Sequence, residues 1–111
     1  MDITFKTKKQ EKIFNSEKEL KKAYGTDNAV KIMRRLAVLR AASSLADVPA
    51  TPPERCHPHS GSGRGHYTVD VKQPFRLIFE AVPPDLPMDD RSQVILAKIT
   101  AIRILGMEDM H

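Results

Sequence analysis

Residues 55–67, RCHPHSGSGRGHY, concentrate side chains that bind metals, hold phosphates or move protons. Three histidines, at positions 57, 59 and 66, supply the residue type that most often transfers protons in proteins. Cys56 adds a thiol, and the two arginines carry permanent charge. The stretch therefore fits a metal site, a phosphate-binding loop or part of a centre that cleaves RNA. A plain flexible turn is the fourth interpretation.

The spacing disfavours a metal site and a phosphate loop. Cys56, His57, His59 and His66 are metal-ligand types, but they form neither the C-x₂-C pair nor the H-x₃₋₅-H pair that is typical of zinc. The GSGRG segment differs from the glycine-rich phosphate motifs and precedes a predicted strand, whereas those motifs open a helix. We therefore expect no metal and no cofactor.

Cleavage of RNA by its own 2′-hydroxyl needs a base, an acid and a fixed positive charge, but no metal. His57 precedes a predicted hairpin, Arg76 lies on its second strand, and Asp109 and His111 close the sequence. Neighbouring strands of one sheet could bring these four side chains together. The spacing leaves open the alternative that the histidines are surface decoration.

The apolar pattern predicts the elements that must position these residues. Strands are expected at 2–5, 66–71, 75–82 and 93–105, the last with a break near Thr100. One polar helix is expected at 8–24, where a Ser16–Glu19 capping box restarts or kinks it, and a second from Thr26 or Asp27 to about Ser43. The order β-α-α-β-β-β predicts one α+β domain over residues 1–111, with two N-terminal helices on one face of a mostly antiparallel sheet.

Positive charge is concentrated in the N-terminal part. Residues 1–40 hold eleven Lys and Arg against five Asp and Glu, whereas residues 41–111 hold seven against nine. Lys31, Arg34 and Arg35 are predicted to project, with Arg40, from the polar side of the second helix. This pattern predicts contacts with RNA or ribosomal phosphates, and a solvated helix face is the alternative.

The composition is that of a soluble protein, with 41% hydrophobic and 29% charged residues. No apolar run approaches the roughly 18 residues of a membrane span, and the charged N-terminus is unlike a signal peptide. Cys56 is the single cysteine and has no disulfide partner in the sequence. We therefore expect a cytoplasmic location, without a membrane partner.

Two blocks of the sequence resemble the HigB toxins of the RelE/ParE superfamily. RCHPHSGSGRGHYTVDVKQPFRLIFE is similar to that family's HP loop, G-x-R-x-G turn and aromatic-Arg-aliphatic-x-Phe strand, and AIRILGMEDMH is similar to its terminal strand followed by EDYH. The resemblance implies a RelE-like fold and a ribosome-dependent mRNA endonuclease. It also implies a toxin of a type II toxin–antitoxin pair, whose partner is a HigA-like helix-turn-helix antitoxin.

Site residues follow from the resemblance position by position. His57 and His111 correspond to the general base and the general acid, in either order. Arg76 corresponds to the group that stabilises the phosphorane, and Asp109 to the residue that orients a histidine or positions the 2′-hydroxyl. Arg64 and His66 are expected to contact RNA, in place of a family lysine that falls near Ser60.

Two features depart from the family pattern. Met110 stands where the family has a tyrosine, so a stacking surface for a base is lost. The proline-rich loop at 83–92 is long and acidic. Two alternatives stay open: a ParE-like member that inhibits a protein target, and a degenerate, noncatalytic member that acts as a regulatory partner.

Overall fold

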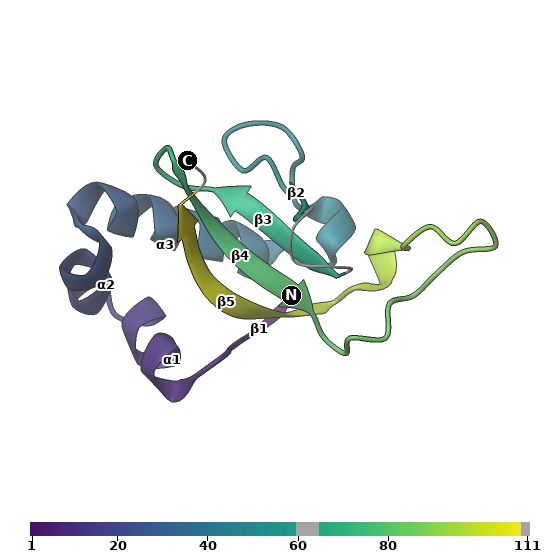
Figure 1. Cartoon of the computed structure of the whole chain (residues 1–111), viewed down its shortest axis with the longest axis horizontal. Helices are drawn as coiled ribbons and strands as arrows, with labels where there is room; N and C mark the ends of the chain where they lie inside the picture. The colour runs from purple at the N-terminus through teal and green to yellow at the C-terminus, as the bar shows by residue number, and fades with distance from the viewer. Residues whose placement is uncertain (60–64, 110–111) are drawn as a thin grey trace.

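The computed structural model describes residues 1–59 and 65–109. It is an α+β fold in which the helices precede most of the sheet (Figure 1). The helices are α1 (Lys8–Phe14), α2 (Glu17–Tyr24) and α3 (Thr26–Ala41). The strands are β1 (Asp2–Phe5), β2 (His57–Pro58), β3 (His66–Asp70), β4 (Phe75–Ala81) and β5 (Ala101–Asp109). They form one sheet in the order β1-β5-β4-β3-β2.

The described N-terminal region contains three helices, so the prediction of two is wrong. Asn15 and Ser16 interrupt the predicted helix and separate α1 from α2. The Ser16 hydroxyl accepts a hydrogen bond from the Glu19 backbone N–H at 3.2 Å, which is the capping contact that the sequence predicts. The capping residue adopts extended backbone angles, and it therefore begins a new helix instead of bending one.

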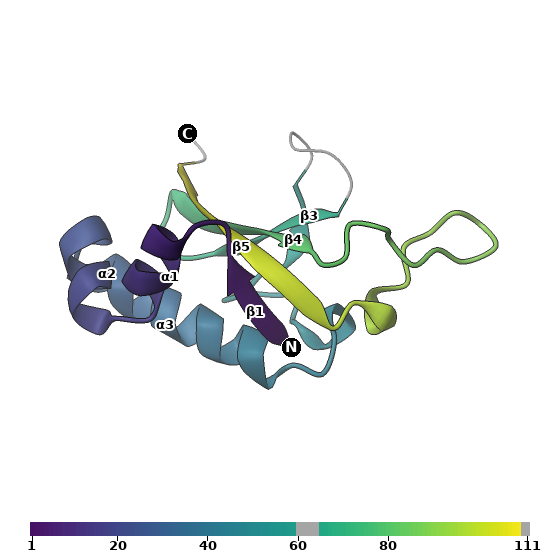
Figure 2. The ribbon, with the colours of Figure 1, turned by 90° about the horizontal axis from the view of Figure 1, so that it is seen from below.

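The longest helix, α3, runs along one face of the sheet (Figure 2). Its Ile32, Leu36 and Leu39 are buried in one core with Leu77 and Phe79 of β4. Side chains alternate along a strand, so the residues between these core positions project from the opposite face. We call this opposite side the outer face, and it carries most of the candidate chemistry.

The pairing of β3 with β4 is antiparallel, as the sequence predicts, and β4 with β5 and β2 with β3 are antiparallel too. The first strand differs, because β1 lies parallel to β5. The sheet is therefore mixed, although most of its pairings are antiparallel.

The last strand is shorter than predicted. β5 begins at Ala101, while the segment before it makes one isolated bridge, between Met88 and Val94, and a 3₁₀ turn at Leu96–Lys98. Opposite this segment β4 has already ended, and Pro83 and Pro84 have no N–H to continue a ladder. Its β-branched residues thus lack a partner strand, and the connection projects away from the body (Figures 1 and 2).

Candidate functional site

Two rows of polar side chains cross the outer face from β3 to β5. In the first, Asp70 pairs in register with Arg76, and Arg76 pairs with Glu108. In the second, His66 pairs with Glu80, and Glu80 with Arg103. We name these the Arg76 row (Asp70, Arg76 and Glu108) and the Glu80 row (His66, Glu80 and Arg103).

A bulge in β5 decides which acid joins the Arg76 row. Ile78 pairs with Gly106 but Phe79 pairs with Ile104, so Leu105 has no direct partner on β4. The extra residue reverses the alternation of side chains beyond it. Glu108 therefore stands opposite Arg76, on the face where unbroken alternation from Ile104 would have placed Asp109.

Glycine and a helix side chain hold this bulge in place. Gly106 has φ +142°, a conformation that residues with a side chain rarely adopt. Gln10 of α1 donates a hydrogen bond from Nε2 to the carbonyl of the unpaired Leu105 at 2.9 Å. A Cβ atom on Gly106 would approach that same Nε2 to 3.3 Å. The N-terminal helix thus helps to set the register of the site strand.

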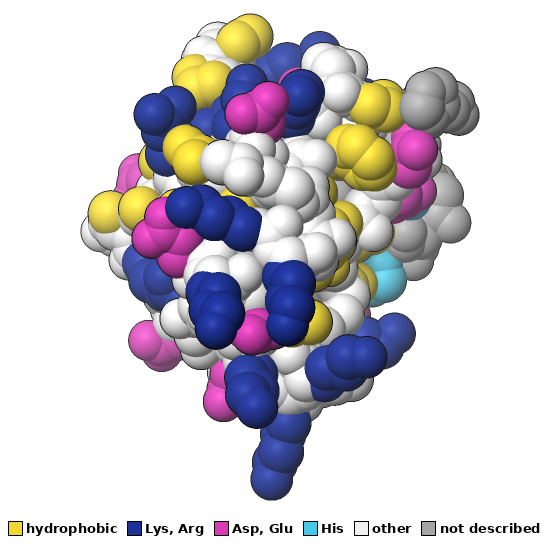
Figure 3. Space-filling model, turned by 90° about the vertical axis from the view of Figure 1, so that its left-hand side faces the viewer, with side chains coloured by type: hydrophobic (Ala, Val, Ile, Leu, Met, Phe, Trp, Pro, Cys, Tyr) yellow, Lys and Arg dark blue, Asp and Glu magenta, His cyan; other side chains and the backbone are white. Residues whose placement is uncertain are grey.

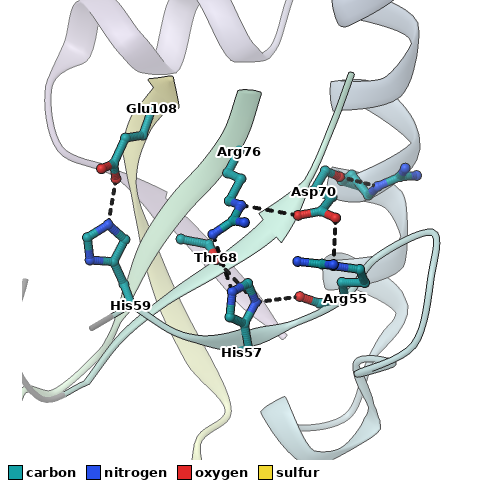
Figure 4. A network of polar contacts seen from close by, with 8 residues as sticks. Arg55, His57, His59, Thr68, Asp70, Arg76 and Glu108 are labelled. Carbon is teal, nitrogen blue, oxygen red and sulfur yellow. Dashed lines mark hydrogen bonds and ion pairs between the residues drawn. The ribbon is translucent and has the colours of Figure 1, made fainter. Parts of the chain in front are cut away.

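His57 lies beside the Arg76 row, on the short edge strand β2 (Figure 4). Its Nδ1 is 2.7 Å from the carbonyl oxygen of Arg55. A carbonyl only accepts, so Nδ1 carries the hydrogen and the neutral ring keeps a lone pair on Nε2. That Nε2 is 3.4 Å from Nη1 of Arg76. In this tautomer the pair sets the Nε2 lone pair against a permanent positive charge.

The guanidinium of Arg76 is held loosely. Its Nε is 3.4 Å from Oδ1 of Asp70, and its contact with His57 is equally long. Both distances exceed the usual range of N–H hydrogen bonds. Each acid of the row has a closer partner, because Asp70 lies 2.8 Å from Nε of Arg55 and Glu108 lies 2.7 Å from Nε2 of His59. Arg76 can therefore turn toward an incoming anion.

His59 and Glu108 form a pair that the sequence did not predict as a site. The His59 ring is mostly buried, with 10% of its side chain exposed, and its Nε2 must carry the hydrogen that faces the carboxylate. Figure 4 shows His57 and His59 projecting from one segment, with Arg76 between Glu108 and Asp70. The H-x-H spacing beside a strand was the available signal, because residues two apart on a strand share a face.

Of the four predicted catalytic residues, the structure brings His57 and Arg76 together. Asp109 ends β5 in register with Phe75, one position beyond the row. It is exposed, and alternation directs it to the other face from Glu108. His111 lies outside the described residues, as does the neighbouring Met110.

The predicted RNA-binding residues are placed differently from one another. Arg34 is exposed on α3 and Lys31 is partly exposed, as expected for a polar helix face. His66 is held in the Glu80 row, with its Nε2 3.1 Å from Glu80. Arg64 lies outside the described residues.

Arg35 is not on the polar side of α3, so that prediction is wrong. It is 6% exposed, and its Nε donates a hydrogen bond of 2.6 Å to the backbone carbonyl of Asp70. Position 35 lies on the buried face of α3, since Ile32 and Leu36, which flank it on the helix surface, are both buried. Arg35 therefore fastens the helix to the sheet and is not available to RNA.

A dense basic surface covers the helical end of the molecule (Figure 3). Seven lysines lie between positions 6 and 22, and all of them are exposed. Three glutamates accompany them, of which Glu17 pairs with Lys21 at 2.9 Å. The net positive charge predicted for this end is thus displayed to solvent.

Two cavities adjoin His57. One, of about 340 Å³, is lined by His57, Arg55 and the segment 50–52. The other, of about 490 Å³, is mostly apolar and includes Cys56 and Tyr67 in its wall. Burial raises the pKa of the Cys56 thiol to about 11, so the thiol is protonated at neutral pH.

The described residues offer neither a metal-binding cluster nor a membrane span. Within residues 1–59 and 65–109, no three side chains of His, Cys, Asp or Glu are grouped so that they could hold a metal ion. None of the described helices combines the length and apolar character that a bilayer crossing requires.

Comparison with known proteins adds no relative. No family model, no curated protein and no solved structure matches this chain. The interpretation of the site therefore depends on its own geometry and on the resemblance in the sequence.

Proposed function

We propose that this chain is a ribosome-dependent mRNA endonuclease, the toxin of a type II toxin–antitoxin pair with a helix-turn-helix antitoxin. The observation that carries the proposal is the approach of His57 Nε2 to Arg76 Nη1 on the outer face. These two residues are the ones for which the resemblance to HigB toxins implies proton transfer and charge stabilisation.

The chemistry needs no metal. His57 Nε2 takes the proton of the 2′-hydroxyl, and the resulting oxygen attacks the adjacent phosphorus. Arg76 stabilises the negative charge of the phosphorane, and its loose contacts allow it to follow that charge as it develops. The bond to the 5′-oxygen then breaks, which leaves a 2′,3′-cyclic phosphate and a 5′-hydroxyl.

The leaving 5′-oxygen takes a proton from a general acid. His59 is a candidate for this role, because its ring lies beside the Arg76 row with Nε2 2.7 Å from the Glu108 carboxylate. His111 is the other candidate, from the family resemblance. Cleavage by variants at position 59 and at position 111 will decide between the two.

Two surfaces support RNA as the substrate. The cavity of about 340 Å³ beside His57 and Arg55 offers room for part of a nucleotide. The lysine-rich helical end, together with Lys31 and Arg34, suits association with ribosomal RNA. Both lie outside the core that α3 forms with the sheet.

The direct test supplies purified protein to ribosomes translating a defined message and maps the products. We expect cuts that leave a 2′,3′-cyclic phosphate and a 5′-hydroxyl, and a single 2′-deoxy nucleotide at the cut site should block that cut. His57→Ala should lower the rate of cleavage by at least about 10²-fold, whereas Asp85→Asn, in the projecting connection, should leave the rate unchanged.

Other outcomes would favour the alternatives. An intact message together with arrested growth would overturn the nuclease proposal and favour a ParE-like protein target. An intact message with normal growth and a stable complex with an antitoxin would favour a noncatalytic regulatory member.

A further inference from the structure

Asp70 is a buried carboxylate between two guanidinium groups. Its side chain is 9% exposed. Oδ2 lies 2.8 Å from Nε of Arg55, and Oδ1 lies 3.4 Å from Nε of Arg76. Burying a carboxylate is costly unless charges and hydrogen bonds compensate it, so both guanidinium groups are drawn to this point.

The two arginines reach His57 from opposite sides. Arg55 meets the ring through its backbone carbonyl, which accepts the hydrogen bond from Nδ1 at 2.7 Å. Arg76 meets the ring through Nη1, 3.4 Å from Nε2. The four contacts therefore form a closed cycle, which runs from Asp70 to Arg55, to His57, to Arg76 and back to Asp70 (Figure 4).

The backbone of Arg55 needs this support. Its φ is +46°, in the left-handed region that is unfavourable for a residue with a side chain. This turn aims the Arg55 carbonyl at His57. Asp70 holds the turn twice, since its carboxylate binds the Arg55 side chain and its backbone N–H donates to the Glu54 carbonyl at 2.8 Å.

The backbone of Asp70 is fixed relative to the helix layer. The Asp70 carbonyl accepts the 2.6 Å hydrogen bond from Arg35 of α3, which is buried. Asp70 thus transmits the position of α3 to the strained turn before His57 and to the guanidinium of Arg76.

We infer that Asp70 is a positioning residue of the active site, which fixes the tautomer of His57 and the orientation of Arg76 without touching the RNA. The inference rests on the proposed function for its catalytic meaning. The tautomer itself is a property of the free protein, so it can be tested without RNA.

The first experiment records the ring nitrogens of the histidines by ¹⁵N NMR in the full chain. We expect wild-type His57 to hold its proton on Nδ1. Asp70→Asn should give a mixture of tautomers at His57, while His66 should change little. Glu80→Gln is the matched control, since it removes a partly buried carboxylate from the other row and should leave His57 unchanged.

Arg55→Gln provides a second route if Asp70→Asn fails to fold. The Arg55 side chain is 43% exposed, so its replacement should leave the core intact. It removes the contact between the Asp70 carboxylate and the Arg55 side chain, and the same mixture of His57 tautomers is expected. A single unchanged tautomer in Arg55→Gln, and in Asp70→Asn where it folds, would overturn the positioning role.

The second experiment measures cleavage under single-turnover conditions. Asp70→Asn should lower the rate at saturating ribosome on the order of 100-fold, with little change in the concentration needed for saturation, because it misplaces reacting groups without removing a group that binds RNA. If wild-type protein leaves RNA intact while the tautomer responds as expected, the proposed function fails and the positioning role stands. If wild-type protein cuts RNA and Asp70→Asn cuts equally well, the positioning role fails alone.

Discussion

The Arg76 row and the Glu80 row lie on the same three strands, yet their central charges are held differently. Glu80 is bound closely on both sides, by His66 at 3.1 Å and by Nε of Arg103 at 2.7 Å. Among the described residues, Arg76 has only the 3.4 Å contacts with Asp70 and His57. The first central charge is satisfied within the protein, whereas the second is oriented but incompletely neutralised.

The looser contacts of Arg76 indicate where an anion would bind. A phosphate approaching the Glu80 row would meet a carboxylate already paired with two basic groups, and it would have to displace one of them. At the Arg76 row it would replace two weak contacts with charge-assisted hydrogen bonds, which are stronger. A similar set of residue types thus serves as a structural pair in one row and as a candidate catalytic centre in the other.

Removing the arginine of each row should give the largest difference between the two rows. If the proposed function holds, Arg76→Ala should lower the rate of cleavage by about 10²–10³-fold, since it would delete the charge proposed to stabilise the phosphorane. Arg103→Ala is the matched control on the neighbouring strand and should cleave at nearly the wild-type rate. Equal reductions of the rate in both variants would show that the rows do not differ as described.

The reactivity of the Cys56 thiol reports on the packing of the segment that carries His57. This segment lies beside the Arg76 row. Because burial raises its pKa from 9.0 to about 11, the thiolate fraction at neutral pH is about 100-fold lower than for an ordinary cysteine. Alkylation by iodoacetamide should be slowed by about that factor in the folded protein. It should accelerate as the pH rises toward 11, and in urea. Rapid alkylation at neutral pH would mean that residues 55–57 are not packed in this way.

Gly106 controls which acid joins the Arg76 row. Gly106→Ala places a side chain at φ +142° and close to Gln10, so we expect it to lower the free energy of unfolding by about 1–3 kcal/mol in urea titrations. Cleavage should fall as Glu108 loses its place beside His59. Gln10→Ala keeps the glycine and should have a smaller effect on both. Full stability of Gly106→Ala would argue against the bulge.

The basic surface of the helices should contribute to affinity for the ribosome and not to the rate of the cleavage step. Reversing charge in Lys31→Glu and Arg34→Glu should weaken ribosome association and reduce the salt dependence of the binding constant, by roughly one unit of log–log slope for each phosphate that the variant no longer binds. Lys98→Glu, in the 3₁₀ turn before β5, is the control. A ribosome-binding constant that is unchanged in both variants would mean that this face of α3 is an ordinary solvated surface.

Much of the fold was readable because local signals agreed with tertiary packing. The apolar stripe of α3, the capping contact of Ser16 and the antiparallel pairing of β3 with β4 are all present. The failures arose where a distant partner decides the outcome. Residues 93–100 have the composition of a strand, but no strand lies opposite them in the described part of the chain.

The candidate site was partly readable for the same reason. His57 and Arg76 come together because the hairpin of β3 and β4 forms as predicted and the loop before it pairs with β3. Glu108 was missed because one bulged residue exchanges its face with that of Asp109. Arg35 was misassigned because its partner, the Asp70 carbonyl, is 35 residues away in sequence. A glycine inside the last strand was the available sign of a bulge.

Under the proposed function, His57 and Arg76 act as one unit in RNA cleavage. A double-mutant cycle measures this directly, with His57→Ala, Arg76→Ala and the double variant compared in single-turnover cleavage on translating ribosomes. The account predicts that the double variant is slowed about as much as either single variant, since each change already disables the shared step. Rate reductions that multiply independently, or a double variant that cleaves at nearly the wild-type rate, would contradict it.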